Sequence, residues 1–206
     1  MIDLYTGATS NGYRATIVLE ESGLPYRLHW MDLSTGVQKQ PAFLAINPQG
    51  QIPALVDEAG PGGARVALAQ SVAILIYVAE KAGILLPAGG AERVATIQRT
   101  MQAATDVGTA MTGLMLTTRF APEPMPSAAS LFEARFAAQC ATMDSILANS
   151  AYLAGADYSI ADIALFGLVK RLEDKVAALP GLAHLKAWMA TVAERPAVQR
   201  ALAKPA

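Results

Sequence analysis

The chain has 206 residues, of which 53% are hydrophobic and 16% charged, and its formal net charge is −1. This composition favours a compact, helix-rich globular protein over a disordered chain. No basic run offers a surface for nucleic acid, and the most apolar run, VAILIYVA, is too short to span a membrane. A single cysteine, Cys140, excludes an internal disulfide, and no signal-peptide pattern is evident, so we expect a cytoplasmic protein.

The first residues alternate between strand and helix patterns. Residues 2–5 alternate as a short strand, residues 11–22 carry an apolar helical face that Gly23 ends, and residues 26–32 alternate again. A strand, a helix and a second strand in this order predict a right-handed βαβ unit with parallel strands.

A second group of elements follows a connecting segment. Residues 52–57 and 64–69 flank the turn sequence EAGPGG and predict an antiparallel hairpin. A helix from Ser71 then extends to Gly83. The first part of the chain, residues 1–83, is therefore expected to be an α/β domain with the order βαβ-ββα.

Strand signals almost vanish after this point, so residues 91–206 predict an all-helical domain. Residues 94–115 carry an apolar stripe of a long helix, and residues 132–147 carry a second one. Ser159 and Asp162 predict a capping box at the start of a further helix. Two more helical segments follow, the last with Pro196 in its first turn. The stripes comprise Val94, Ile97, Met101, Ala104, Gly108, Met111 and Met115, then Phe132, Phe136, Cys140, Met143 and Leu147.

Few residues suggest metal or covalent chemistry. His29 lies in a predicted strand and His184 in a terminal helix, so the two histidines and Cys140 do not predict a zinc site. Cys140 falls on an apolar stripe, where a cysteine usually behaves as a small hydrophobic residue. No phosphate loop, nucleophile elbow or paired-carboxylate motif is present.

Three short polar stretches remain, ATSNGYR, GQIP and AQS, each at a strand end or a helix start. Helix caps and turns explain each one singly. Because such ends gather along one edge of an α/β sheet, together they predict a polar groove suited to an anion.

The order of elements and four motifs resemble the glutathione transferase family along nearly the whole chain. The motifs are QIPALVD, QSVAILIYVAEK, YLAGADYSIADIAL and PGLAHLKAWMATVAERPAV. The segments TSNGYRATIVLEESGLPYR and AINPQGQIPALVD are most similar to the bacterial nu-class branch of glutathione-dependent disulfide-bond oxidoreductases. The resemblance implies a thioredoxin-like N-terminal domain, glutathione as co-substrate, no metal, and a homodimer.

The resemblance also implies roles for particular residues. Thr9 and Asn11 would address the glutathione sulfur. Pro53 would follow a cis peptide bond, and Ile52 would pair with the cysteinyl unit. The other implied contacts to glutathione are those of Gln38, Gln51, Gln70, Ser71 and Arg135. Met111 and Met115 would line a pocket for the second substrate, and Asp106 would reach the partner subunit's site.

The sequence departs from the family at Gln70, where most relatives carry a glutamate that faces the γ-glutamyl ammonium. The helix containing GTAMTGLMLTTRF also lacks the histidines and the Gly-Pro-Met pattern of the nu-class branch. The expected function is a glutathione-dependent enzyme acting on a disulfide or a small electrophile, with disulfide reduction favoured over conjugation. The alternative is a non-catalytic binding or regulatory protein with the same fold.

Overall fold

The computed structural model describes residues 1–204, which form two compact units. The first unit contains Met1–Leu86 together with the segment from Glu194 onward, and the second contains Pro87–Ala193. The division after Leu86 lies within the interval 83–91, where the sequence changes character. The C-terminal segment, which the sequence analysis assigned to the helical domain, groups with the first unit.

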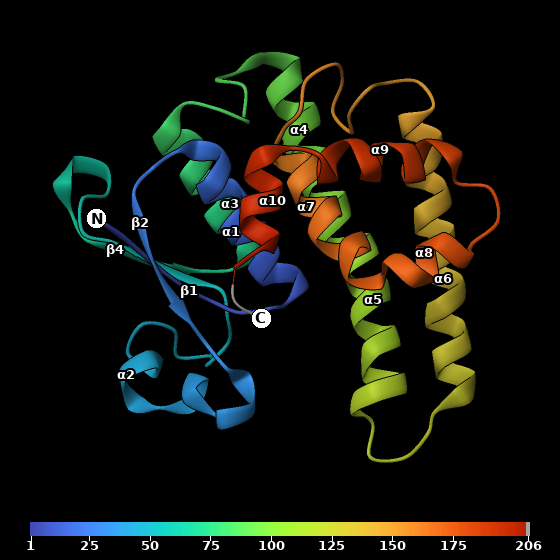
Figure 1. Cartoon of the computed structure of the whole chain (residues 1–206), viewed down its shortest axis with the longest axis horizontal. Coiled ribbons are helices and arrows are strands. Elements are labelled where there is room, and N and C mark those ends of the chain that lie inside the picture. Colours follow the sequence, from blue (N-terminus) through green and yellow to red (C-terminus); the bar gives the residue numbers. More distant parts are fainter. Residues whose placement is uncertain (205–206) are drawn as a thin grey trace. The chain divides into compact units, whose positions relative to one another are not determined.

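The first unit is built on a four-stranded mixed sheet with the strand order β2-β1-β3-β4 (Figure 1). Strand β1 pairs in parallel with β2 and antiparallel with β3, and β3 pairs antiparallel with β4. This topology confirms the predicted βαβ-ββα fold. The strands are β1 (Ile2–Thr6), β2 (Tyr26–Trp30), β3 (Ala54–Asp57) and β4 (Val66–Ala69).

Two helices supply the apolar layer against this sheet. Helix α1 (Ser10–Ser22) begins at the Thr9 cap and ends at Gly23, which has a left-handed conformation. Helix α3 (Ser71–Ala82) packs beside α1 and ends in the same way at Gly83. The core side chains here are fully buried and include Leu4, Ile17, Leu19, Leu55, Ile74, Leu75 and Val78.

Four short segments connect these elements, and sequence periodicity did not reveal them. Each has only three or four residues, too few to display a helical repeat. They are η1 (Leu33–Thr35), η2 (Val37–Lys39), α2 (Pro41–Leu44) and η3 (Pro61–Gly63).

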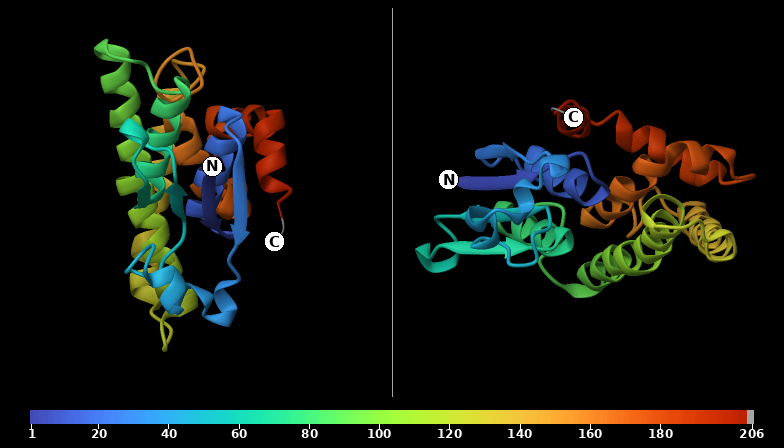
Figure 2. Two further views of the ribbon diagram at one scale, coloured as in Figure 1. Left: turned by 90° about the vertical axis from the view of Figure 1, so that its left-hand side faces the viewer. Right: turned by 90° about the horizontal axis from the view of Figure 1, so that it is seen from below.

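The C-terminal helix α10 (Pro196–Leu202) packs against α1, which is why the end of the chain belongs to the first unit (Figure 2). Arg195 forms a bidentate ion pair with Glu21, with its Nε 2.7 Å from Oε1 and its Nη2 3.0 Å from Oε2. Paired, parallel bonds of this kind are the strongest arrangement of arginine with carboxylate.

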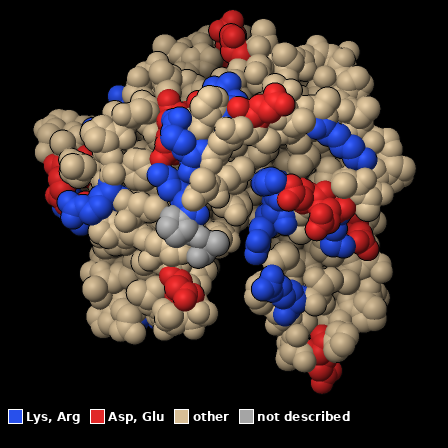
Figure 3. Space-filling model, viewed as in Figure 1, with Lys and Arg blue, Asp and Glu red and all other residues tan. Residues whose placement is uncertain are grey.

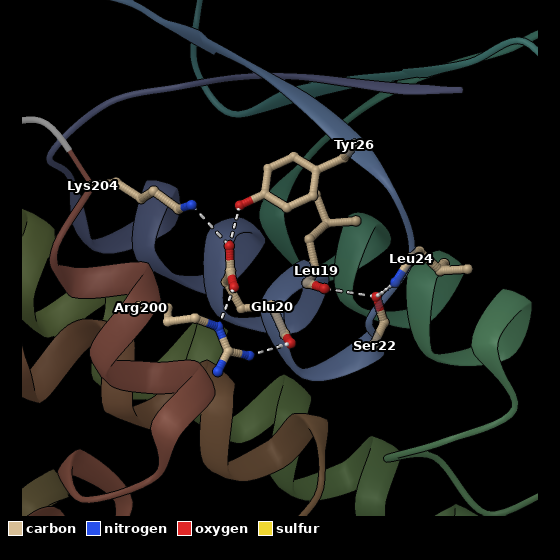
Figure 4. A network of polar contacts seen from close by, with 7 residues as sticks. All are labelled: Leu19, Glu20, Ser22, Leu24, Tyr26, Arg200 and Lys204. Carbon is tan, nitrogen blue, oxygen red and sulfur yellow. Dashed lines mark hydrogen bonds and ion pairs between the residues drawn. The ribbon is translucent and has the colours of Figure 1, made fainter.

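Glu20 forms the centre of a second contact between α1 and the C-terminal segment (Figure 4). Its carboxylate accepts hydrogen bonds from Tyr26 at 2.6 Å and Arg200 Nε at 2.8 Å, and the ammonium of Lys204 lies 3.0 Å away. Partial burial alone would raise the pKa of Glu20, but these three donors outweigh it and lower the pKa to about 2.

The second unit has helices as its regular elements, and an isolated bridge joins Tyr152 to Gly155. Its longest stretch runs without a break in helical geometry through α4, η4, α5 and η5, in which η4 and η5 are single π-helical turns. Its elements are α4 (Gly90–Gln102), η4 (Ala103–Val107), α5 (Gly108–Met115), η5 (Leu116–Phe120), α6 (Pro126–Leu147), α7 (Ile160–Val169), η6 (Lys170–Leu172), α8 (Glu173–Ala178) and α9 (Ala183–Ala193).

The predicted apolar stripe of the long helix is wrong in its first half. Val94 and Met101 are 67% and 44% exposed, whereas the threonines at positions 96 and 100 are buried. Each buried threonine donates its hydroxyl to the carbonyl four residues earlier, at 2.8 and 2.7 Å. Because the helix itself satisfies the hydroxyl, threonine packs there as a small side chain.

The predicted capping box of α7 is confirmed. The carboxylate of Asp162 is fully buried and accepts from the amides of Leu153 and Ser159, each at 3.0 Å. It also accepts from the indole of Trp188 on α9 at 3.0 Å. This one side chain therefore joins the start of α7, the preceding loop and α9.

No helix within residues 1–204 is both long and apolar enough to cross a membrane. Basic and acidic side chains are interspersed on the face of each unit visible in Figure 3.

The Glu20 contacts predict a pH dependence of stability. The pKa of Glu20 is lower in the folded state than the ordinary value of about 4.3. Its contribution is therefore fully present above that value and is lost as pH falls towards 2. Glu20→Gln should lower the free energy of unfolding at pH 7 by roughly 1 kcal/mol, allowing for solvent screening.

Denaturant unfolding at a series of pH values tests this expectation. Between about pH 4.5 and pH 2, the wild type should lose stability more steeply than Glu20→Gln. Glu58→Gln is the matched control, since Glu58 and its partner Arg65 are both about half exposed. Parallel curves for wild type and Glu20→Gln would contradict the assigned role.

Candidate functional site

One groove of the first unit collects most of the polar residues that the sequence singled out. It lies where α1 and α3 begin and where the chain enters β3. Its lining residues are Asn11, Asn47, Gln49, Gln51, Ile52, Pro53, Ala69, Gln70 and Ser71.

The start of α1 places Thr9 and Asn11 together. The Oγ1 of Thr9 accepts a hydrogen bond from the amide of Gly12 at 2.9 Å and so caps the helix. This bond uses a lone pair of the hydroxyl and leaves its hydrogen for another acceptor. Asn11, two residues later, is exposed and lines the groove.

Gly12 allows this turn to approach the end of β1. A Cβ atom at position 12 would lie 2.1 Å from the carbonyl oxygen of Gly7 and 2.7 Å from Oγ1 of Thr6. No side chain fits at that distance, so the close contact requires glycine.

Arg14 lies directly behind Asn11 and Ser71, and sequence analysis did not identify it. Its Nη1 donates to Oδ1 of Asn11 at 2.9 Å and to Oγ of Ser71 at 3.2 Å. Only 3% of Arg14 is exposed, and burial lowers its pKa to about 10, so it remains charged at neutral pH. The sequence feature that could have identified Arg14 is its position four residues after Ser10, on the same helical face and one turn beyond the Thr9 cap.

Asn47 is a second residue that sequence analysis missed. It is 4% exposed, donates from Nδ2 to the carbonyl of Gln51 at 2.6 Å, and accepts at Oδ1 from the amide of Gln49 at 3.2 Å. These bonds hold the loop that precedes Pro53. The Ile52–Pro53 peptide bond is cis, as the family resemblance implies.

Gln70 precedes α3 with φ 73° and ψ 113°. A non-glycine residue at positive φ costs of order 1–3 kcal/mol and persists only where the surrounding structure imposes it. Its side chain lines the groove beside Ser71, the first residue of α3. The amides of a first helical turn have no acceptor within the helix, so they favour an anion at this end of the groove.

Gln38 lies outside the lining of this groove. It belongs to η2, and its Nε2 is 3.4 Å from the carbonyl of Leu33. The backbone beside it contacts the loop through Gly50, where a Cβ atom would lie 2.8 Å from the carbonyl of Gln38. The backbone of Gln38 therefore lies against this loop.

Four predicted site residues belong to the second unit. Arg135 is exposed on α6, and Asp106 is exposed in η4, where it accepts from Oγ1 of Thr105 at 3.1 Å. Met111 is buried in the helical core, and Met115 is half-buried one turn later.

The groove can offer hydrogen-bond donors and one buried positive charge. None of its lining residues is a carboxylate or a thiol. Within residues 1–204, no group of three or more His, Cys, Asp or Glu side chains could hold a metal ion. Cys140 is 1% exposed in the second unit, and burial raises its pKa to about 12. The arrangement therefore suits an anionic ligand that brings its own reactive group.

Two family models match the chain. Residues 10–81 match the glutathione S-transferase N-terminal domain, and residues 127–196 match the C-terminal domain. The disulfide-bond oxidoreductase YfcG of Escherichia coli is 37% identical over 205 residues, covering 99% of this chain and 95% of the relative.

Solved structures agree with this match. A glutathione transferase family member from Pseudomonas fluorescens, with two glutathione molecules bound, has a TM-score of 0.92 and is 34% identical, covering 99% of this chain and 93% of that one. A glutathione transferase from Pseudomonas putida, with one glutathione disulfide bound per subunit, has a TM-score of 0.91 and is 31% identical, covering 100% and 92%.

The bonds of Asn47 predict that the loop depends on it. Asn47→Ala removes two hydrogen bonds from a buried position and should lower the free energy of unfolding by about 2 kcal/mol. Amide hydrogen exchange at residues 47–51 should quicken more than exchange in the sheet. Gln49→Ala, an exposed change in the same loop, is the control, and equal effects of the two changes would contradict the role of Asn47.

Proposed function

The chain belongs to the glutathione S-transferase family, and on that premise we propose that it uses glutathione as a thiolate to reduce disulfides. One observation carries the proposal. Thr9 caps α1 and Asn11, two residues later, lines the groove, while the single cysteine of the chain is buried in the other unit with a raised pKa. The reacting thiol therefore has to come from the ligand.

The donors suffice to ionise that thiol. A free thiol has a pKa near 8.5. One hydrogen bond to a charged acceptor contributes roughly 1.5–3 kcal/mol, and a helix N-terminus about 0.3–1 kcal/mol. At about 1.36 kcal/mol per pKa unit, Thr9, Asn11 and the start of α1 can lower the thiol pKa by one unit or more. A thiolate then forms near neutral pH without a protein base.

The rest of the groove suits the remainder of glutathione. We assign Gln51, Ile52 and Pro53 to the cysteinyl unit, which can pair with the backbone there. Gln70, Ser71 and the first turn of α3 receive the γ-glutamyl carboxylate. We assign Gln38 to the glycyl end. The roles that the resemblance implies for Arg135, Met111 and Met115 of the second unit stay predictions.

The reaction takes two glutathione molecules. The bound thiolate attacks one sulfur of a disulfide, forms a mixed disulfide and releases the other sulfur as a thiolate, which takes a proton from water. A second glutathione thiolate attacks the glutathione sulfur of the mixed disulfide. Glutathione disulfide and the second free thiol leave. The relatives with two glutathiones or one glutathione disulfide bound support this stoichiometry.

This chemistry needs a pool of reduced glutathione, which the cytosol maintains. We accordingly place the protein in the cytoplasm.

A calorimetric titration with reduced glutathione, followed by turnover of hydroxyethyl disulfide against chlorodinitrobenzene, tests the proposal that the protein reduces disulfides with glutathione. Saturable binding with preferential disulfide turnover supports it, whereas faster turnover of chlorodinitrobenzene would favour conjugation. Absence of binding would favour a non-catalytic protein.

Asn11→Ala should lower kcat/KM for hydroxyethyl disulfide by roughly 10- to 100-fold, because one hydrogen bond to the thiolate is lost. The glutathione thiol pKa in the complex should rise with it. Cys140→Ala should retain kcat/KM, since that buried thiol takes no part. Unchanged turnover in Asn11→Ala, or inactivity of a folded Cys140→Ala, would refute the assignment.

We also propose a homodimer in which α4 contributes to the interface and Asp106 reaches the partner subunit's site. Val94 and Met101 lie two turns apart on the same side of α4 and are 67% and 44% exposed, and exposed apolar side chains that share one face can mark an interface. Light scattering after size exclusion should give twice the chain mass at micromolar protein, and Met101→Glu should shift it towards the monomer. A monomeric wild type would refute the dimer.

A further inference from the structure

Arg14 is a buried cation that donates to two neutral groups of the groove, Asn11 and Ser71. Arginine is rarely this buried in proteins. The cost of placing a charge here is offset only where its hydrogen bonds are well made. The position of Arg14 behind the groove therefore points to a role in holding Asn11 and Ser71.

The chemistry of guanidinium determines which end of the Asn11 amide faces it. Arginine has five N–H donors and no acceptor, so the atom of Asn11 at 2.9 Å from Nη1 has to be the oxygen. The hydroxyl of Ser71 also donates to this oxygen, at 3.2 Å. The Nδ2 group is at the opposite end of the planar amide, so its two hydrogens point away from Arg14.

An asparagine amide without such a partner has no strong preference between its two orientations, because its terminal torsion is broad and roughly two-fold. The reversed amide would present an oxygen to an anionic sulfur and repel it. A donor-only side chain behind Asn11 removes this alternative. It also holds Oγ of Ser71 at the start of α3.

We propose that Arg14 is a positioning residue, which fixes the amide of Asn11 with its N–H groups towards the glutathione sulfur and fixes the hydroxyl of Ser71 at the γ-glutamyl end. This inference rests on the proposed function and adds the residue that gives Asn11 its direction. Arg14 itself acts from behind Asn11 and Ser71.

The test is the pKa of the bound glutathione thiol, measured from the ultraviolet absorbance of the thiolate against pH. In Arg14→Gln, the thiol pKa should rise by at least about 0.3 unit, a twofold loss of thiolate, because the amide then orients both ways. Arg14→Lys keeps the charge and a donor and should recover part of the shift. Arg65→Gln removes an arginine that is about half exposed and should leave the thiol pKa unchanged.

A double-mutant cycle separates positioning from a direct effect of charge. If Arg14 acts through Asn11, Arg14→Gln in the Asn11→Ala background should shift the thiol pKa by less than half as much as in the wild type. An equal shift in both backgrounds would overturn the proposal, because the charge would then act on the sulfur directly. An unchanged thiol pKa in Arg14→Gln would overturn it as well.

Nuclear magnetic resonance of the ligand-free protein provides a readout that needs neither glutathione nor Arg14→Gln, the variant that removes the buried charge. The side-chain amide signals of Asn11, assigned by their loss in Asn11→Ala, should shift or broaden in Arg14→Lys and remain unchanged in Arg65→Gln. Unchanged signals in Arg14→Lys would overturn the proposal. A wild type that forms no thiolate with glutathione would refute the proposed function, and the amide signals would still decide the role of Arg14.

Discussion

The site depends on how closely the first turn of α1 approaches the end of β1. Gly12 permits that approach, because any side chain there would collide with the carbonyl of Gly7. The Thr9 cap then fixes the residue at which the helix begins. Asn11 consequently faces the groove, and Arg14, one turn later, lies behind it. A shift of the helix start by one residue would rotate the side chains of Thr9, Asn11 and Arg14 about the helix axis by about 100°.

Signals confined to a few neighbouring residues were enough to predict most of the fold. Gly23 ends α1 as its sequence position suggests, and Ser159 with Asp162 forms the capping box. The missed features depend on partners or packing that periodicity does not record. Arg14 meets Ser71 across 57 positions of the chain. The buried face of α4 carries threonines, whose hydroxyls bond within the helix, so hydropathy misplaced it.

The sequence predicted most of the residues of the candidate site, but it did not predict how they are held in position. The ends of β1, β3 and β4 were expected to meet, and six of the proposed glutathione contacts line one groove. Residue types alone did not reveal how Asn11 is oriented, or that Asn47 supports the loop before Pro53. Both depend on buried side chains that accept or donate within the fold. A polar residue inside a protein is informative mainly through its partner.

The ion pairs of the C-terminal segment have a consequence for how the protein is made. Chains emerge from the ribosome N-terminus first, and domains generally fold as units during synthesis. The first unit here includes Arg195 and Arg200, which pair with Glu21 and Glu20 near the beginning of the chain. Most of the thioredoxin-like unit is translated before the helical unit, yet it gains its full set of contacts only after Arg195 and Arg200 have left the ribosome. The helical unit, residues 87–193, is fully translated before that C-terminal segment is made.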